Sequence, residues 1–270
     1  MAEWTMPKGD LMRGKKGLVM GVANDKSIAF GIATQLAAQG ADMAFAYMGE
    51  SLLKRVAPLA ESIGVKHLIE CDVTNDASMD AAFAKLKSIY GEIDFVIHSI
   101  AFANKNELQG SFVENTTREG FMLAMNVSAY SFVDVSRRAA ELMPNGGSLV
   151  TLTYLGAERV IPNYNTMGVA KAALEAATRY IARDLGPKGI RVNAISAGAM
   201  RTLSLAGISG GRALHSKSGQ FSLLKSETSM EGVAGAALWL ASDLGASTTG
   251  EVVHVDGGFH VVGLPEGLEG

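Results

Sequence analysis

The feature that most constrains what this chain can fold into is a regular alternation of short apolar runs with longer segments of helical periodicity. Seven runs are rich in aliphatic and β-branched side chains; they occupy residues 17–21, 42–47, 66–71, 93–97, 148–152, 191–195 and 252–255. Between them, apolar residues recur every three to four positions, most clearly over residues 28–36, 172–185 and 230–240. The pattern predicts strands that alternate with helices.

Alternating strands and helices at this spacing predict a parallel sheet that is covered by helices on both faces through right-handed crossovers. We therefore expect an α/β fold, a Rossmann-type doubly wound sheet of seven parallel strands. No Pro- or Ser-rich linker divides the chain, so residues 1–270 are expected to form one domain. The rhythm breaks at residues 197–228, where a long irregular segment predicts a lid, with an ordinary surface insertion as the alternative.

Composition narrows the function classes. The net charge is −3, a balance that excludes a general polyanion binder, so we expect no nucleic-acid partner. Cys71 is the single cysteine, which excludes a disulfide framework and a cysteine-based zinc cluster. The apolar runs are far shorter than the ~20 residues of a membrane span, and the N-terminal segment lacks the apolar core of a secretory signal. We expect no membrane association and a cytoplasmic location.

The first predicted strand ends in a turn that suits a phosphate-bearing ligand. Gly21 permits a tight turn and a close approach of a ligand to the backbone. Ser27 is placed to cap the following helix, whose free N–H groups and positive dipole end favour a pyrophosphate. The standard G-x-G-x-x-G spacing is absent, since Gly21 and Gly31 have nine residues between them. The position after the first strand still favours a dinucleotide, because ligands bind at the carboxyl ends of such strands.

Two later strand ends fit the same ligand. Asp72 and Val73 follow the third strand, where a carboxylate and a backbone N–H could hold an adenine ring, although Asp72 could equally cap a helix that starts near Asn75. After the second strand, residues 47–50 read Tyr-Met-Gly-Glu, with no basic residue before Lys54. A basic residue there would accept a 2′-phosphate, so the sequence favours NADH over NADPH.

The segment after the fifth strand carries a candidate catalytic pair. Tyr164 and Lys171 are seven residues apart, so they share a face if both lie on one helix. A lysine ammonium favours a more acidic phenol, which makes the tyrosine a candidate acid or oxyanion stabiliser. Such pairs are common on helix surfaces, and only their position at the carboxyl end of a central strand favours a functional site.

Four segments are distinctive as a set. Tyr154, Tyr164 and Lys171 stand in YLGAERVIPNYNTMGVAK, and HSIAFA (98–103) follows the fourth predicted strand. The other two segments are RVNAISAGAMRTLS (191–204) and GEVVHVDGGF (250–259). Over residues 14–259 the chain resembles the bacterial NADH-dependent enoyl-(acyl-carrier-protein) reductases, a branch of the short-chain dehydrogenase/reductase superfamily. Ordinary members of that superfamily carry Tyr-x-x-x-Lys and Asn-Asn-Ala-Gly, whereas none of the six tyrosines here has a lysine four residues on, and HSIAFA replaces Asn-Asn-Ala-Gly.

The resemblance implies reduction of the trans-2 double bond of enoyl thioesters by NADH, the last step of the bacterial type II fatty acid elongation cycle. It implies Tyr154, Tyr164 and Lys171 as catalytic residues, and Ala103 with the two tyrosines as substrate contacts. The implied cofactor contacts are Gly21, Ser27, Ile28, Met48, Asp72, Val73, Ile100, Lys171, Met200, Arg201, Thr202, Leu203 and Ser204. The implied partners are an acyl carrier protein that carries the substrate and three further copies of the chain in a homotetramer.

Three positions depart from the family's pattern. Met48 stands where relatives often have glutamine, which removes a side-chain hydrogen bond to the adenosine ribose. Ala101 replaces a common glycine and would narrow the cavity near the thioester. Ala199 replaces a frequent proline where the lid begins.

The implied chemistry leaves negative charge on the thioester oxygen, which a hydrogen bond from Tyr164 would stabilise. Tyr154 would either orient the thioester or only line the pocket. Two other function classes compete with this interpretation. The missing Tyr-x-x-x-Lys disfavours a short-chain carbonyl or alcohol oxidoreductase, and the presence of both Tyr164 and Lys171 disfavours a non-catalytic NAD-binding sensor. The histidines show no metal-ligand spacing, so no metal site is expected.

Overall fold

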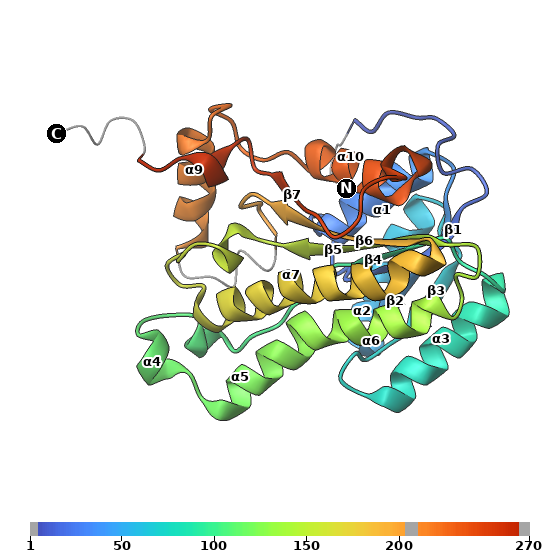
Figure 1. Cartoon of the computed structure of the whole chain (residues 1–270), viewed down its shortest axis with the longest axis horizontal. Helices are drawn as coiled ribbons and strands as arrows, with labels where there is room; N and C mark the ends of the chain where they lie inside the picture. The colour runs from blue at the N-terminus through green and yellow to red at the C-terminus, as the bar shows by residue number, and fades with distance from the viewer. Residues whose placement is uncertain (1–4, 203–209, 265–270) are drawn as a thin grey trace.

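The computed structural model describes residues 5–202 and 210–264, apart from the side chain of Arg212, and shows one parallel sheet between two layers of helices (Figure 1). The strand order is β3-β2-β1-β4-β5-β6-β7, and each neighbouring pair is parallel. The strands are β1 (Lys16–Met20), β2 (Asp42–Tyr47), β3 (His67–Glu70), β4 (Phe95–His98), β5 (Gly147–Thr153), β6 (Ile190–Ala197) and β7 (Val252–Val255). The predicted doubly wound, seven-stranded fold is confirmed.

Helices follow the strands in the predicted alternation. The longer ones are α1 (Ile28–Ala38), α2 (Gly49–Ser62), α3 (Asp76–Tyr90), α5 (Arg118–Met125), α6 (Ser131–Ala140), α7 (Asn165–Leu185), α9 (Gly211–Phe221) and α10 (Met230–Ala241). The short ones are α4 (Phe112–Asn115) and the 3₁₀ helices η1 (Lys105–Glu107), η3 (Leu155–Ala157), η4 (Gly186–Lys188), η5 (Asp243–Gly245) and η6 (Phe259–Val261). No described helix is long and apolar enough to cross a membrane.

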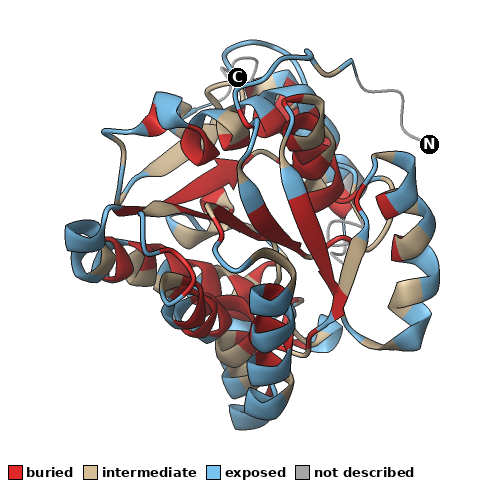
Figure 2. Cartoon of the chain, turned by 90° about the vertical axis from the view of Figure 1, so that its right-hand side faces the viewer, coloured by how far each residue is buried: buried red, intermediate tan, exposed pale blue. Residues whose placement is uncertain are grey.

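The core lies on both faces of the sheet because successive strand side chains point to opposite sides. Val19 and Phe45 belong to a buried cluster with α1, α2 and α10, whereas Leu18 and Ala44 belong to a second cluster with α3, α6 and α7. Figure 2 shows the buried strands between helices whose inner faces are buried and whose outer faces are exposed. This two-sided burial explains why the strands read as nearly continuous apolar runs.

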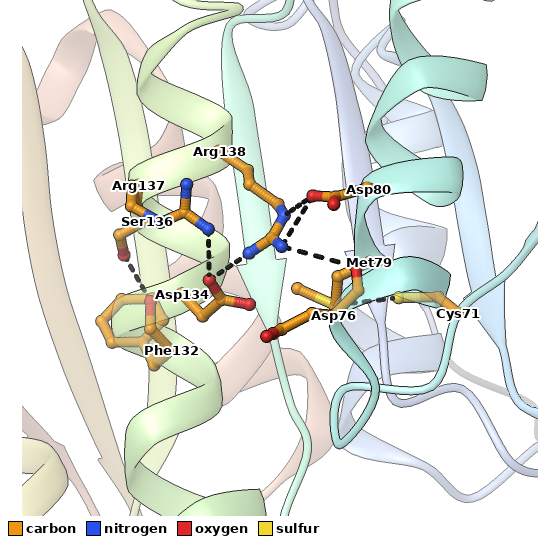
Figure 3. Close-up of polar contacts among 9 residues, drawn as sticks. All are labelled: Cys71, Asp76, Met79, Asp80, Phe132, Asp134, Ser136, Arg137 and Arg138. Carbon is orange, nitrogen blue, oxygen red and sulfur yellow. Dashed lines mark hydrogen bonds and ion pairs between the residues drawn. The ribbon is translucent and has the colours of Figure 1, made fainter.

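A buried ion-pair network fastens α3 to α6 on one face of the sheet (Figure 3). Arg138 is 6% exposed and Asp134 is 2% exposed, and their side chains pair directly. The same guanidinium donates to Asp80 Oδ1 from Nη2 at 2.7 Å, and Asp134 also accepts from Arg137 at 2.9 Å. Each buried charge therefore has a partner, as a buried charge requires.

The helical segment from Arg118 to Ala140 contains one wide turn. Between α5 and α6 lies η2 (Asn126–Tyr130), a π-helical turn. Such turns shift the side chains that follow them and occur often at functional sites. Here Val127 of the turn lines the cleft at the carboxyl ends of the strands, whereas Asn126, Ala129 and Tyr130 line a separate groove.

Candidate active site

A cleft of about 1300 Å³ opens at the carboxyl ends of the strands. Six strands contribute to it, through residues 21–23, 46–48, 71–74, 99–104, 152–154 and 197–200. The strand order reverses between β1 and β4, and in doubly wound folds ligands bind outside the carboxyl ends at such a reversal. The volume exceeds the roughly 300–1,000 Å³ of a typical small-ligand pocket, so the cleft has room for a cofactor and a substrate together.

Gly21 occupies the turn after β1 because no other residue fits there. Its φ is +97°, and a Cβ atom would lie 2.0 Å from the backbone oxygen of Ser99. The sequence predicted that a ligand would approach the backbone closely at this glycine. In the structure, the backbone of Ser99, in the turn after β4, already makes such an approach. The two turns together form the floor of the cleft below the start of α1.

Ser27 precedes α1, as expected, but the predicted side-chain cap is wrong. Its hydroxyl accepts hydrogen bonds from the backbone N–H groups of Ala23 at 3.0 Å and Asn24 at 2.9 Å, so it closes the β1–α1 turn instead. The first turn of α1 has no side-chain cap and borders the cleft at Ile28. The start of this helix thus remains available to an anion.

Asp72 and Val73 line the cleft after β3. Asp72 does not cap the following helix, because Asn75 is the N-cap and accepts from the Ser78 N–H at 2.9 Å. The Asp72 carboxylate instead accepts from the backbone N–H and the hydroxyl of Thr74, at 2.9 and 2.7 Å. That pairing fixes the carboxylate at the edge of the cleft.

Met48 also lines the cleft and is 60% exposed at the start of α2. The nearest basic residue along the chain, Lys54, pairs with Glu50 across one helical turn at 2.8 Å. Ile100, Ala103, Met200 and Thr202 line other parts of the same cleft. Arg201 is exposed outside it and faces Glu227 at 3.4 Å. Leu203 and Ser204 lie outside the described residues.

Tyr154 and Tyr164 come together in the cleft. Their rings meet edge to face with centroids 5.1 Å apart. Tyr164 is 8% exposed and belongs to a small apolar cluster with Leu108 and Met167, against which Ala103 and Tyr154 pack. The Tyr154 hydroxyl is buried and has no hydrogen-bond partner among the described residues. An unpaired buried hydroxyl is costly, so this group is poised for a ligand.

Both phenols stay protonated near neutral pH. Burial, followed by the neighbouring Tyr154 and Glu175, raises the pKa of Tyr164 far above its usual range. Burial and the Asp256 carboxylate raise the pKa of Tyr154 to about 12. The expectation that Lys171 would make Tyr164 more acidic is therefore wrong, because the loss of solvent outweighs any attraction to the ammonium. Two neutral phenols can donate hydrogen bonds to an oxyanion.

Lys171 lies in the second turn of α7, whereas Tyr164 is the residue before the helix rather than a part of it. The Lys171 Nζ donates to the backbone oxygen of Leu152 at 2.7 Å. Burial lowers its pKa to about 8, partly offset by the Glu175 carboxylate. The ammonium keeps two further protons for other acceptors. Lys171 and both tyrosines line the same cleft.

Gly156 makes the position of Tyr164 possible. A Cβ atom at this glycine would lie 2.3 Å from Cδ1 and 2.6 Å from Cε1 of the Tyr164 ring. A side chain in η3 would thus occupy the space that the ring fills. The sequence does not reveal this contact, because Gly156 lies in η3 and Tyr164 lies before α7, so no single element with a regular period connects them.

His98 is a structural residue beside the site. Its ring nitrogens contact the hydroxyls of Thr151 and Ser131, at 3.1 and 2.9 Å. Burial and the nearby Lys171 charge lower its pKa to about 3, so it is neutral at physiological pH. Within the described part of the chain, no group of three or more metal-ligating side chains could hold a metal ion.

Comparisons with known proteins identify the family. The chain matches the family described as enoyl-(acyl carrier protein) reductase over residues 21–260. It is 52% identical to enoyl-(acyl-carrier-protein) reductase (NADH) 2 of Rhizobium meliloti over 94% of this chain and 95% of that protein. It is 45% identical to the corresponding NADH enzyme of Escherichia coli over 94% and 97%. This chain belongs to the enoyl-(acyl carrier protein) reductase family.

The solved structures of the family agree with this assignment. The enoyl-(acyl-carrier-protein) reductase of Anaplasma phagocytophilum, crystallised with NAD, has a TM-score of 0.93 and 52% identity, over 97% of this chain and 99% of that one. The family that the sequence resembles is thus confirmed, as is the doubly wound fold. The names of the two relatives specify NADH, the cofactor that the sequence favours.

Several cleft residues were missed at the level of sequence. Met167 lies one turn beyond Tyr164, and its helical spacing would have revealed it. Leu108, Glu107 and Thr117 also line the cleft, but they lie in a segment without periodicity. Their positions depend on contacts that fold the 99–117 segment back onto α5, and no local pattern predicts those.

Proposed function

We propose that this chain is an enoyl-(acyl-carrier-protein) reductase that uses NADH to reduce the trans-2 double bond of enoyl thioesters in fatty acid elongation. The observation that carries the proposal is the meeting of two buried, neutral phenols and one buried lysine in a cleft that also includes the start of α1. Family membership adds the reaction class.

The residues fit a dinucleotide cofactor. The start of α1 beside Gly21 and Ser27 would take the pyrophosphate, and Asp72 with Val73 would hold the adenine. Met48 borders the adenosine pocket without a polar side chain, and Ile100 would pack along the cofactor. Met200 and Thr202 would contact the nicotinamide end. The family resemblance extends this contact to Leu203 and Ser204, and also to Arg201, although the Arg201 side chain lies outside the cleft and faces Glu227. When bound, the cofactor supplies a hydride.

Tyr164 would donate its hydroxyl proton in a hydrogen bond to the thioester oxygen as that oxygen gains negative charge. Its raised pKa suits this role, since the proton remains on the phenol near neutral pH. Tyr154 would act as a second donor that orients the thioester, which its unpaired hydroxyl supports. Ala103 would contact the acyl chain beside both rings.

Lys171 would bind the nicotinamide ribose with the protons that Leu152 leaves free. The positive charge of Lys171 would also stabilise the enolate. The ammonium would pass a proton through water to the α-carbon of the substrate. This proton path requires the ammonium form, which burial makes less stable than in water.

We further infer that residues 1–270 act as one dinucleotide-binding and catalytic domain and that residues 197–228 form its lid. Support comes from α9, whose His215 donates from Nδ1 to the Ala199 oxygen at 2.7 Å and so connects the lid helix to the cleft wall. The substrate would arrive on an acyl carrier protein, in the cytoplasm, where that carrier and NADH meet.

We infer a homotetramer as the working assembly. A groove of about 610 Å³ between α5, η2 and α7 is lined mainly by apolar side chains, including Met122 and Tyr130, which are 62% and 53% exposed. A second copy of the chain is the occupant that we assign to this groove, since identical apolar faces pair in symmetric oligomers. Sedimentation equilibrium would test it. We expect the mass of a tetramer for the wild type and a smaller mass for Met122→Asp. A wild-type monomer, or an unchanged tetramer in the variant, contradicts the assignment.

The reaction is tested by following NADH absorbance with crotonyl-CoA, and with a carrier-linked enoyl substrate. We expect oxidation of NADH, and slower oxidation of NADPH, because no basic side chain stands after β2 before the paired Lys54. Tight binding of NADH without oxidation by any enoyl thioester would contradict the proposal and favour a binding protein instead.

A further inference from the structure

One wall of the cleft is a segment that follows β4, residues 102–107, here called the wall loop. Ala103, within it, and Leu108, just after it, belong to the apolar cluster around Tyr154 and Tyr164. The loop therefore borders the part of the cleft where the acyl substrate would lie, rather than the α1 end. The loop is held to the α5–η2 helix at two points, once through the backbone of Phe102 and once through the side chain of Glu107.

Ser128 holds the first end of the wall loop. This side chain lies in the π-helical turn, is fully buried, and bonds both backbone polar groups of Phe102. Its hydroxyl accepts from the Phe102 N–H at 2.9 Å and donates to the Phe102 oxygen at 3.0 Å. A hydroxyl has only one proton, and Ser128 donates it to Phe102, so this side chain donates to no other residue.

Glu107 holds the second end of the wall loop. Glu107 is 6% exposed, and its carboxylate Oε1 accepts from the Thr117 hydroxyl at 2.7 Å. Thr117 is the N-cap of α5, and its oxygen accepts in turn from the Gly120 N–H at 3.0 Å. A Cβ atom at Gly120 would lie about 2 Å from the carboxylate oxygens, so the carboxylate packs directly on the helix backbone.

We propose that Ser128 and Glu107 are positioning residues that hold the wall loop against the α5–η2 helix and thereby set the affinity of the site for the acyl part of its substrate. The inference rests on the proposed function. Ser128 acts through Phe102. Glu107 borders the cleft, but its Oε1 accepts from Thr117, and through this bond it ties the loop to the start of α5. Their release would let the loop move beside Tyr164 without changing the cofactor contacts at α1.

The test compares Ser128→Ala with Ser136→Ala. Ser136 is equally buried on the next helical segment, but its hydroxyl bonds the Phe132 oxygen of its own helix, so it controls for loss of a buried hydroxyl. We expect Ser128→Ala to raise the KM for an enoyl thioester by about tenfold with a smaller change in kcat. The Kd for NADH should not change, and Ser136→Ala should alter none of the three.

Thr117→Val provides a second variant at an exposed position, in case Ser128→Ala folds poorly. It removes both the bond to Glu107 and the hydroxyl that caps α5, and it should raise the same KM. Direct titration of crotonyl-CoA onto the NAD⁺-loaded protein separates this inference from the reaction, because it measures thioester affinity even if the wild type does not oxidise NADH. Equal thioester affinity in the wild type and in both variants would overturn the proposal. So would equal losses of NADH and thioester affinity, which would indicate a purely structural role.

Discussion

Replacing Gly156 by alanine should move Tyr164 without altering any group that takes part in the proposed reaction. The added Cβ would lie 2.3 Å from the ring, more than 1 Å short of the 3.4 Å at which ordinary contact begins. The ring is buried against Leu108 and Met167, so it must shift by about this amount as a unit. A misplacement of ~1 Å in a catalytic group costs up to about 10²-fold in rate. We expect kcat to fall about 30- to 100-fold.

The assay is steady-state oxidation of NADH by crotonyl-CoA, with NADH affinity measured by fluorescence titration and stability by thermal unfolding. The overpacked variant should lose about 1–3 kcal/mol of unfolding free energy, while its NADH affinity should not change. Gly235→Ala is the matched control. This glycine lies in α10 with open space around its Cα, so alanine should leave the rate unchanged and stabilise the helix by about 0.5–1 kcal/mol.

A double variant separates the steric effect from other causes. Once Tyr164→Phe has removed the hydroxyl, its position no longer matters to the oxyanion, so Gly156→Ala should add little further loss to Tyr164→Phe. Wild-type turnover in Gly156→Ala would refute the argument that this ring position is required. Full additivity in the double variant would show that the glycine acts through something other than the Tyr164 hydroxyl.

Three further predictions address the cofactor end, pH and the fold. Gly21→Ala should weaken NADH binding at least about tenfold, as measured by titration. The φ of +97° disfavours a side chain at this position, and the added Cβ would lie 2.0 Å from the Ser99 oxygen. Burial lowers the pKa of Lys171 to about 8, so its ammonium is lost as pH rises through that value; kcat/KM for NADH should fall above pH ~8 rather than near the ~10.4 of a free lysine. Asp134→Ala leaves the buried Arg138 with an exposed partner only and should cost about 3–5 kcal/mol in urea unfolding, with normal turnover per folded molecule.

The doubly wound fold could be predicted because its strands are buried on both faces and its helices are amphipathic, so each element has a local pattern. Boundaries were less certain where pairing rather than composition sets them. The fifth and sixth strands were expected at residues 148–152 and 191–195, but they extend to Gly147–Thr153 and Ile190–Ala197 because they pair along their whole length.

The site could be predicted only as far as sequence position implies spatial position. The strand-end rule brought Gly21, Asp72 and Tyr154 to one cleft, as the structure has them. Orientation and electrostatics could not be predicted in this way. The Ser27 hydroxyl turns back to its own loop, and the pKa of Tyr164 rises because burial, a property of the whole fold, outweighs a nearby charge.

The central claim is that the neutral Tyr164 hydroxyl stabilises the thioester oxygen during reduction. Its most direct test is the rate of NADH oxidation by a saturating enoyl thioester in Tyr164→Phe, with NADH affinity measured on the same preparation. Removal of one such donor should lower turnover by about 10²–10³-fold while NADH still binds. Turnover equal to that of the wild type would contradict the claim and leave the Tyr154 hydroxyl as the donor to examine.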